Sequence, residues 1–481
     1  MSYLIIASLI GYFIIIFLIS FITGKRAGNF GFFLGNRKSP WYIVAIGMIG
    51  ASISGVTFVS VPGWVITSQF SYLQMVFGYL IGYFVIANVL MPLYYRLNII
   101  SIYGYLEKRF GFYSYKTGAS FFLISRLVGS AVRLYLASSV LHFTVFSNWH
   151  IPFFVTVVIT LLLIWLYTYR GGVKTIVWTD SVQAIMFLTA VIITIFQIAD
   201  ALNLNFKTLV DTIYRNPLSK TFFFDNFLSD PNHFIKQFVS GIFIAIVMTG
   251  LDQDMMQKNL SCKNINDAKK NMYWYSFALL PVNIIFLSLG VLLVIFANSK
   301  GIPIPDKTDH LYPMIATSNL LSPIVTVLFI IGLMAAALSS ADSALTALTT
   351  SFTVDILNIQ NKFNEEKTKK IRTLVHFALS ILLILIIIIF DIINDESVIS
   401  ATFRIAGYTY GPLLGLFAFG LTNKKSIKDK YVPFIAIVSP IVCYFINKFS
   451  AIIIPNYKFG FELLLINGLL TYFGLRFLIK K

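Results

Sequence analysis

Long apolar segments alternate with short polar ones along nearly the whole chain. A membrane-spanning helix needs about 20 mostly apolar residues, and thirteen segments of the sequence reach or approach that length. They lie near residues 3–22, 41–66, 73–95, 118–146, 151–169, 175–197, 236–251, 272–297, 318–350, 371–391, 399–421, 431–447 and 461–479. The pattern predicts an all-α integral membrane protein with 13 transmembrane helices.

The basic residues divide unevenly between the two sets of alternating loops. If the N-terminus lies outside, the loops assigned to the cytoplasm carry 26 of the 37 Lys and Arg residues, and the outside loops carry 8. The other three, Arg126, Arg133 and Arg404, fall inside predicted spans. Because short cytoplasmic loops are the basic ones, we expect a multi-pass cell-membrane protein with its N-terminus outside and its C-terminus in the cytoplasm.

The composition agrees with this class, with 57% hydrophobic and 12% charged residues and a mean hydropathy of +0.80. The net charge of +17 sits mainly in cytoplasmic loops beside anionic membrane lipids, so nucleic acid is not implied. Two cysteines are too few for a metal motif. The longest outside loop, 198–235, is too short for a second domain. We expect one domain over 1–481, acting as a monomer and not as an enzyme.

Small and polar residues interrupt the apolar segment 41–66. Gly47, Gly50, Ser52, Ser54 and Gly55 lower its helix propensity and free backbone carbonyls to bind something else. Close packing of helices through small residues is the alternative interpretation. The segment alone does not decide between them.

The segment 318–350 carries a polar stripe. Ala336, Ser339, Ser340 and Ser343 follow one face of a helix. Facing a broken helix that offers carbonyls, these hydroxyls form an all-oxygen site that suits a hard cation. The alternative is that the hydroxyls bond back to their own helix. Asp342 argues against that alternative, since an acid at the centre of a span costs roughly 2.5 to 3.5 kcal/mol.

A second intramembrane acid lies in the segment 175–197, which contains "VWTDSVQAIMF". Asp180 and Gln183 lie about one turn apart and so share a helix face. Arg170 and Lys174 already mark the membrane edge, which places Asp180 further inward. A functional role is favoured over a structural ion pair.

Five motifs carry a family resemblance that covers nearly the whole chain. They are "FFLGNRKSPWYIVAIGMIGASISG", "YGYLEKRFG", "VWTDSVQA", "DQDMMQKNLSCKN" and "AAALSSADSALTALTTSFTVDI". Together they resemble the sodium:solute symporters, which include sodium/glucose, sodium/proline and sodium/sialic acid carriers. The resemblance implies a LeuT-like core of two inverted five-helix repeats. These would be residues 41–197 and 236–421, with an extra N-terminal helix at 3–22 and two C-terminal helices at 431–479.

In such a core the first helix of each repeat is broken. The sequence agrees, because "IVMTGLDQD" places a glycine in segment 236–251 where "IGASISG" lies in segment 41–66. Interruptions at corresponding positions of two repeats mark a binding site near the midplane.

The resemblance also implies where sodium, the expected cofactor, would bind. The family's common sodium site maps onto the carbonyls of Gly50, Ile53 and Ala336 and the hydroxyls of Ser339 and Ser340. A second sodium, as in the sialic acid carriers, would use Asp180, Ser339 and Ser343, with Asp342 at a position where the family has serine. One or two sodium ions are therefore expected.

Three hypotheses remain for Asp342. It joins Asp180 around the second cation, it carries a proton in place of that cation, or it pairs with an intramembrane arginine. We favour the cation.

The solute-binding residues follow from the same resemblance. Arg404 stands where the sugar carriers have a glutamine and Met248 where they have a tyrosine, which disfavours sugar and favours an anion. The planar guanidinium of arginine binds a carboxylate with two hydrogen bonds. Arg126 and Arg133, seven residues apart on one helix face, are further candidates, although they also suit a snorkelling or ion-pair role. The remaining candidates are Ser52, Ser54, Thr57 and Gln74.

We therefore predict a sodium-coupled secondary active symporter. It would import a small anionic or zwitterionic solute with a carboxylate, such as sialic acid, another organic acid or an amino acid. A sodium/sugar or sodium/neutral-solute symporter is the nearest alternative, and a transporter-like membrane sensor is the alternative from another class. Sodium-driven counterflow in proteoliposomes separates transport from sensing.

Overall fold

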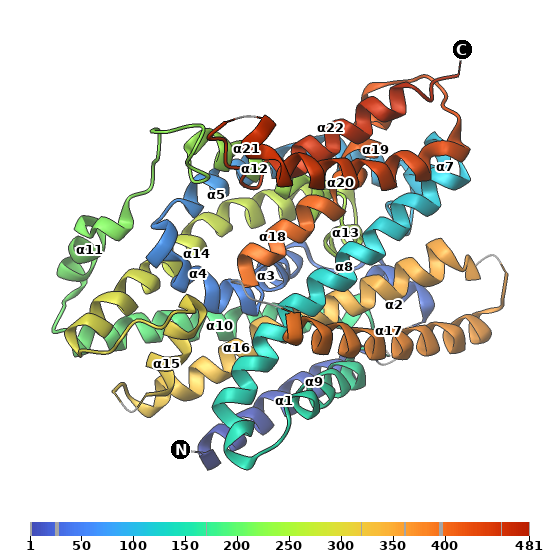
Figure 1. The fold of residues 1–481 in the computed structure, drawn as a ribbon. Coiled ribbons are helices and arrows are strands. Elements are labelled where there is room, and N and C mark those ends of the chain that lie inside the picture. Colours follow the sequence, from blue (N-terminus) through green and yellow to red (C-terminus); the bar gives the residue numbers. More distant parts are fainter. Residues whose placement is uncertain are drawn as a thin grey trace.

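The protein is helical from end to end (Figure 1). The computed structural model describes residues 2–24, 28–169, 171–318, 320–359, 362–393, 398–453 and 455–480. Among these residues there is no β-strand, only two isolated bridges. The predicted all-α class is confirmed.

The helices follow one another in the order of the predicted segments. In the first half they are α1 (Ser2–Gly24), α2 (Asn29–Leu34), α3 (Trp41–Ser52), α4 (Gly55–Ser68), α5 (Tyr72–Val85), α6 (Met91–Leu97), α7 (Gly104–Arg109), α8 (Phe112–Leu141), α9 (Phe153–Thr168), α10 (Val173–Ala201) and α11 (Phe206–Arg215). In the second half they are α12 (Phe234–Ala245), α13 (Gln253–Leu260), α14 (Ile265–Ser299), α15 (Leu311–Thr317), α16 (Pro323–Ser351), α17 (Glu365–Ile393), α18 (Val398–Thr409), α19 (Gly411–Thr422), α20 (Val432–Lys448), α21 (Ser450–Ile453) and α22 (Leu463–Arg476).

Every predicted apolar segment falls on one or more of these helices. Eight described helices are long and apolar enough to cross a membrane, and three bent pairs raise the number to as many as 11. The two other predicted segments correspond to the shorter apolar helices α9 and α22. Membrane-spanning character is thus confirmed, while the count of thirteen crossings stays a prediction.

Glycines let the central helices approach closely. On α3, a β-carbon at Gly47 would lie 3.1 Å from the Val177 carbonyl oxygen of α10, and one at Gly50 would lie 2.6 Å from the Asp180 carbonyl oxygen. Small residues at such spacing are how membrane helices pack. Helix α16, the most deeply buried candidate span at 78%, packs against both α10 and α3. The predicted polar residues therefore lie at the centre of the bundle.

A second interlocked pair is formed by α5 and α12. Gly78 of α5 lies against the Phe238 carbonyl, and Gly241 of α12 lies against the Met75 carbonyl, so closely that neither position has room for a β-carbon. One turn further, Gly82 lies against Ala245, where a β-carbon would stand 2.6 Å from the alanine methyl group. Backbone thus packs on backbone over two helical turns.

The first helix break separates α3 from α4, which meet at a bend of 58°. The last α3 bond runs from Ile53 N to Ile49 O at 2.9 Å, and α4 starts with Phe58 N to Ser54 O at 3.0 Å. The final carbonyls of a helix have no partner within that helix. The carbonyls of Gly50 and Ile53 therefore lie beyond the last hydrogen bond of α3.

The second break separates α12 from α13 with a bend of 63°. Here the carbonyls that lack a bond within their own helix accept hydrogen bonds from side chains elsewhere in the chain. The Tyr94 hydroxyl donates to Gly250 O, and the Tyr103 hydroxyl donates to Leu251 O, each at 2.9 Å. The Asp252 carboxylate caps α13 by accepting from Asp254 N at 2.9 Å. Breaks in both predicted segments are confirmed.

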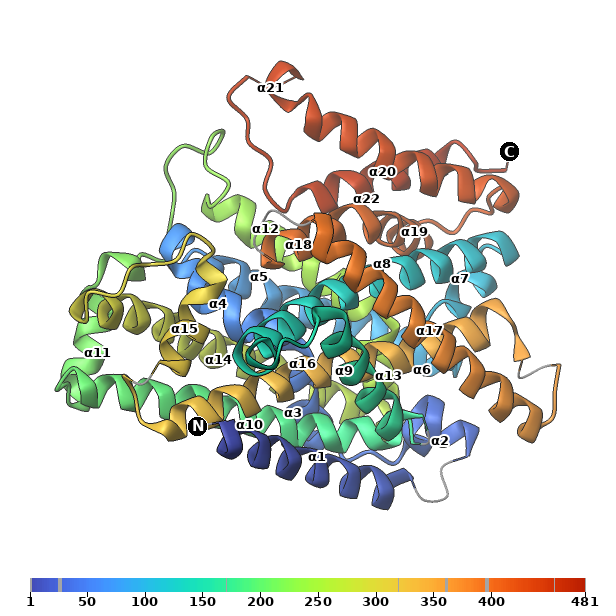
Figure 2. The ribbon, with the colours of Figure 1, turned by 60° about the horizontal axis from the view of Figure 1, so that its bottom comes forward.

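A third bend of 44° separates α18 from α19, and the sequence analysis did not predict it. Pro412 has no N–H to give to the Tyr408 carbonyl. Asn467 of α22 takes over that role and donates to Tyr408 O at 2.8 Å and to Gly407 O at 3.1 Å. In both views, α1 and the α20–α22 region lie at opposite edges of the bundle, with α3, α13 and α16 between them (Figures 1 and 2).

Candidate functional site

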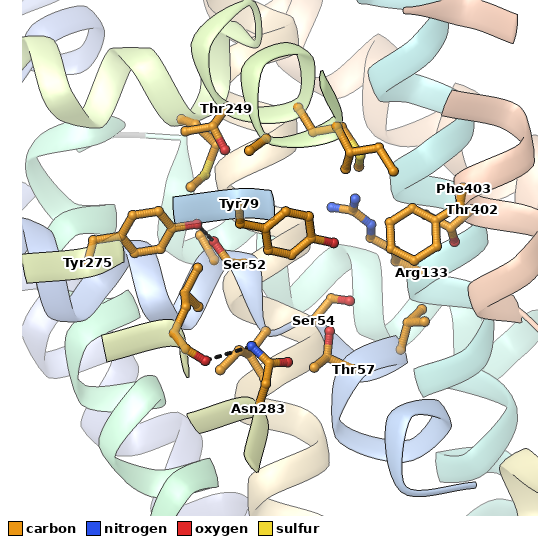
Figure 3. Close-up of a pocket in the computed structure, with 18 of the residues that line it drawn as sticks. Ser52, Ser54, Thr57, Tyr79, Arg133, Thr249, Tyr275, Asn283, Thr402 and Phe403 are labelled. Carbon is orange, nitrogen blue, oxygen red and sulfur yellow. Dashed lines mark hydrogen bonds between the residues drawn. The ribbon is translucent and has the colours of Figure 1, made fainter. Parts of the chain in front are cut away.

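A cavity lies between the two broken pairs (Figure 3). It holds ≈ 840 Å³ of empty space including its open mouth. Its walls come from α3–α4, α5, α8, α12–α13, α14 and α18. The polar lining residues are Ser52, Ser54, Thr57, Tyr72, Tyr79, Tyr83, Arg126, Arg133, Thr249, Tyr275, Asn283 and Thr402.

Hydroxyl groups dominate one side of this cavity. Ser52 and Tyr275 share a hydrogen bond of 2.6 Å, and Tyr275 shares another of 3.1 Å with Tyr83. Ser52 donates in addition to Met48 O at 2.8 Å, the carbonyl four residues earlier on α3. This network fixes the wall at the first break and offers oxygen atoms to the polar groups of a solute.

Two arginines of α8 line the cavity, and they differ in their partners. Arg126 is 4% exposed, forms a close ion pair with Asp254 and lies 3.7 Å from Asp252. None of the ion pairs among the described residues includes Arg133. In Figure 3 its guanidinium lies between the rings of Tyr79 and Phe403. Arg133 is therefore the cation available to an anionic solute.

A series of buried ion pairs runs from the cavity wall into the protein. Lys258 of α13 lies 3.7 Å from Asp254 and 2.8 Å from Asp180. Arg126 joins Asp254 to Asp252, and Asp252 accepts a hydrogen bond of 2.5 Å from Tyr410. The series ties α13 to α8, to α10 and to Tyr410 at the bend between α18 and α19.

Two residues of the expected common sodium site, Gly50 and Ser339, come together where α3 ends against α16. A β-carbon at Gly50 would lie 3.3 Å from Ser339 Oγ, so the Gly50 backbone approaches that hydroxyl. The Ser340 hydroxyl is buried and has no hydrogen-bond partner among the residues that the structure describes. A buried hydroxyl without a partner is costly, and an ion beside it removes that cost. Together with the free carbonyls at the first break, this donor set fits a sodium ion.

The two carboxylates expected at a second cation site have different environments. Asp180 accepts from Ser339 at 2.7 Å and from Ser343 at 3.0 Å, besides its pair with Lys258. Asp342 accepts from Tyr167 at 2.8 Å through one oxygen, and its other oxygen has no hydrogen-bond partner in the described part of the chain. Both side chains are fully buried.

The structure places most of the predicted solute residues in one cavity. Its lining includes Ser52, Ser54, Thr57, Arg126, Arg133 and Met248. Both α8 arginines line it, as their spacing predicted. Gln74 is buried elsewhere and bonds to Asn232 O at 2.8 Å. Arg404 is exposed and is not among the lining residues, because α18 turns Thr402 and Phe403 toward the cavity instead.

The charged residues of α13 were not among the predicted site residues. The charge pattern of the loops predicts Lys258 in a cytoplasmic loop, and "DQDMMQKN" contributed only to the family resemblance. In the structure Lys258 is 2% exposed and paired with two carboxylates. The four-residue spacing of Asp254 and Lys258, typical of a helical ion pair, was the available signal.

Comparison with known proteins gives a consistent result. The model of the family described as "Sodium:solute symporter family" matches residues 32–428. The chain is 27% identical over 263 residues to the sodium-coupled monocarboxylate transporter 1 of Xenopus laevis, which covers 53% of this chain and 40% of the relative. It is 26% identical over 322 residues to the sodium/sialic acid symporter NanT of Aliivibrio fischeri, with 64% and 61% covered. The matches thus span less than two thirds of these relatives.

Solved structures share the fold. A sodium-coupled sialic acid symporter in a substrate-bound, outward-open state superposes with a TM-score of 0.84 at 21% identity, covering 98% of this chain and 97% of that one. The nucleobase-cation-symport transporter Mhp1, in a closed conformation, superposes with a TM-score of 0.60 at 14% identity, with 94% and 95% covered. The bundle therefore has the LeuT-like arrangement of these proteins.

Proposed function

Because the chain belongs to the sodium:solute symporter family, we propose that it is a sodium-coupled secondary active symporter that imports a small organic solute carrying a carboxylate. It is a multi-pass membrane protein. Sodium would bind through the carbonyls of Gly50, Ile53 and Ala336 and the hydroxyls of Ser339 and Ser340. Neither a chemical reaction nor an organic cofactor is required.

The observation that carries the proposal is that one helix break borders both the cavity and the proposed ion site. Ala51 to Ser54 line the cavity, while the same turn leaves the carbonyls of Gly50 and Ile53 without partners in α3. An ion that holds these carbonyls therefore fixes the cavity wall. Coupling follows, since each ligand then binds more tightly when the other is present.

The charge of the solute is proposed from Arg133. Of the two cavity arginines it is the one with no carboxylate partner among the described residues, and its planar fork suits a carboxylate. The N-terminus of α4 adds to this preference, because Ser54 and Thr57 line the cavity around backbone N–H groups that α4 itself cannot satisfy. Ser52 and Asn283 would bind neutral polar groups of the same solute.

The orientation and architecture belong to the same proposal. Residues 41–197 and 236–421 would form the two inverted repeats, with the N-terminus outside and the protein working as a monomer. A cysteine replacing Ser229 in the long loop should label from outside, and one replacing Ser426 only after permeabilisation. The reverse labelling would overturn the orientation but not the transport function.

Uptake into proteoliposomes tests the function. An imposed sodium gradient should drive uptake of a carboxylate solute found by thermal-shift screening with and without sodium. Amide and methyl-ester analogues of that solute serve as controls and should stabilise the protein less. Stabilisation by sugars alone would favour the sodium/neutral-solute alternative. Sodium-dependent binding without any counterflow would favour a sensor.

A further inference from the structure

We propose that the side-chain ammonium of Lys258 takes the place of a second cation beside Asp180, so that this protein binds and transports one sodium ion, not two. The inference deepens the proposed function and rests on it. Its basis is the set of contacts that surrounds the Asp180 carboxylate.

Both oxygens of Asp180 already have partners. Oδ1 accepts from the Ser339 hydroxyl at 2.7 Å. Oδ2 accepts from the Ser343 hydroxyl at 3.0 Å and lies 2.8 Å from Lys258 Nζ. The carboxylate is therefore surrounded by two hydroxyls and one positive charge, the same groups that would hold a small cation, with the cation supplied by the chain itself.

Lys258 is buried between two carboxylates, and Asp180 is the nearer one. Its side chain is 2% exposed, and its other carboxylate neighbour is Asp254, 3.7 Å away on the same helix. Moving the ammonium aside would leave a buried Asp180 and a buried Lys258 each with a lost partner. The helix break at Leu251 and Asp252 is what directs α13, and Lys258 with it, toward α10.

A sodium ion at Asp180 would stand within a few ångströms of this ammonium. Two like charges at that distance repel strongly in a site from which water is excluded. The residues present consequently do not fit a second sodium at Asp180. The common site differs, because its Gly50, Ile53 and Ser340 oxygens contact no cationic side chain among the described residues.

The free oxygen of Asp342 supplies the competing hypothesis. That oxygen is buried without a partner, so a second sodium held by Asp342, with Lys258 left in place, would also give an all-oxygen site. The two hypotheses differ in the effect of removing Lys258. If Lys258 replaces the second cation, removing its charge should add one bound sodium ion. If Asp342 holds the second sodium, the number of bound sodium ions should not change.

Counting sodium ions on purified protein is the direct test. Radioactive sodium binding and the sodium dependence of thermal stabilisation should both give one ion per wild-type chain, with a Hill coefficient of about one. In Lys258→Met, which keeps an unbranched side chain one atom shorter and removes its charge, the count should rise to two. Lys258→Arg keeps the charge and should stay at one.

Other sodium counts would overturn the inference or the proposed function. Two ions on the wild-type chain overturn the inference while leaving sodium coupling intact. One ion on a folded Lys258→Met protein also overturns it, since Lys258 then excludes nothing. If Lys258→Met does not fold, Asp180→Asn decides, because it should keep one ion, and losing that ion would show that Asp180 holds sodium itself. No sodium binding to the wild type would instead contradict the proposed function.

Discussion

The two broken helices bend by nearly the same angle, 58° and 63°, yet the chain treats the two breaks in opposite ways. At α3–α4 the carbonyls of Gly50 and Ile53 lie beyond the last helical bond, beside a hydroxyl without a partner. At α12–α13 the carbonyls of Gly250 and Leu251 accept from tyrosine hydroxyls. The first break keeps its oxygens for a ligand, whereas the second uses its polar groups for structure.

The difference extends to charge. No acidic or basic side chain lies between Trp41 and Ser68, while α13 and its cap carry Asp252, Asp254 and Lys258. A break that binds a cation needs neutral oxygens that are not already engaged in hydrogen bonds. A break with a purely structural role can contain charged side chains as long as they are paired. Mutations at the two breaks should therefore act on different properties, the first on sodium dependence and the second on stability.

The largest effect is expected at the second break. Arg126→Met leaves Asp252 and Asp254 without their buried cation, and breaking a buried pair costs about 3–5 kcal/mol. A large fall in the thermal inactivation temperature, with or without sodium, should follow. Adding Asp254→Asn should recover part of the loss. A single variant as stable as the wild type would remove the ion-pair series from the description of this break.

A smaller effect is expected in the cavity that lies between the breaks. Arg133→Gln removes a charged hydrogen-bonding group worth about 1.5–3 kcal/mol, so the affinity for a carboxylate solute should fall roughly 10- to 150-fold. Arg133→Lys should lose less because the charge stays. Arg404→Gln is the matched comparison, since the sequence predicted that arginine and the structure places it outside the cavity lining. A greater loss in Arg404→Gln would reverse our assignment.

The first break is tested by Ser340→Ala. Its hydroxyl has no hydrogen-bond partner among the described residues, so removing it should keep or slightly raise the stability without sodium and raise the sodium concentration for half-maximal stabilisation about tenfold, equivalent to about 1.4 kcal/mol. Ser60→Ala, which also removes a buried hydroxyl without a partner, is the control. Equal sodium dependence in both variants would contradict the assigned ion site.

The smallest expected effect is that of Tyr94→Phe. The hydroxyl is lost from the Gly250 carbonyl, and a buried hydrogen bond of this kind contributes about 1 kcal/mol. Thermal stability should fall slightly, and sodium dependence should not change. A shift in sodium dependence would mean that the second break also takes part in ion binding.

Much of this arrangement could be predicted from the sequence, because glycines and hydroxyl stripes are local signals. The breaks near Gly50 and Gly250 and the shared face of Arg126 and Arg133 needed only helical spacing. Lys258 could not be placed, since a hydropathy window treats a charged stretch as a loop and does not detect that Asp180, far away in the sequence, pairs with this lysine. Arg404 shows the same limit, because the rotation of α18 depends on which neighbours it packs against.

The bend between α18 and α19 shows that the effect of a helix-breaking residue depends on contacts with distant parts of the chain. Gly411 and Pro412 were visible as helix breakers, but the segment 399–421 was predicted as one span. Whether a proline kinks a helix depends on what satisfies the carbonyl it leaves. Here that group is Asn467, 59 residues from Tyr408 in sequence, and no periodicity connects the two.

The contact of α5 with α12 sets a mechanical condition on transport. Where backbone packs directly on backbone, at Gly78 and Gly241, there is no side chain whose rotation could absorb a sliding movement. Two helices packed in this way cannot slide past each other, so any movement of one requires the same movement of the other. We therefore expect α5 and α12 to move as one lever during the transport cycle, with the bend at Leu251 and Asp252 as its pivot.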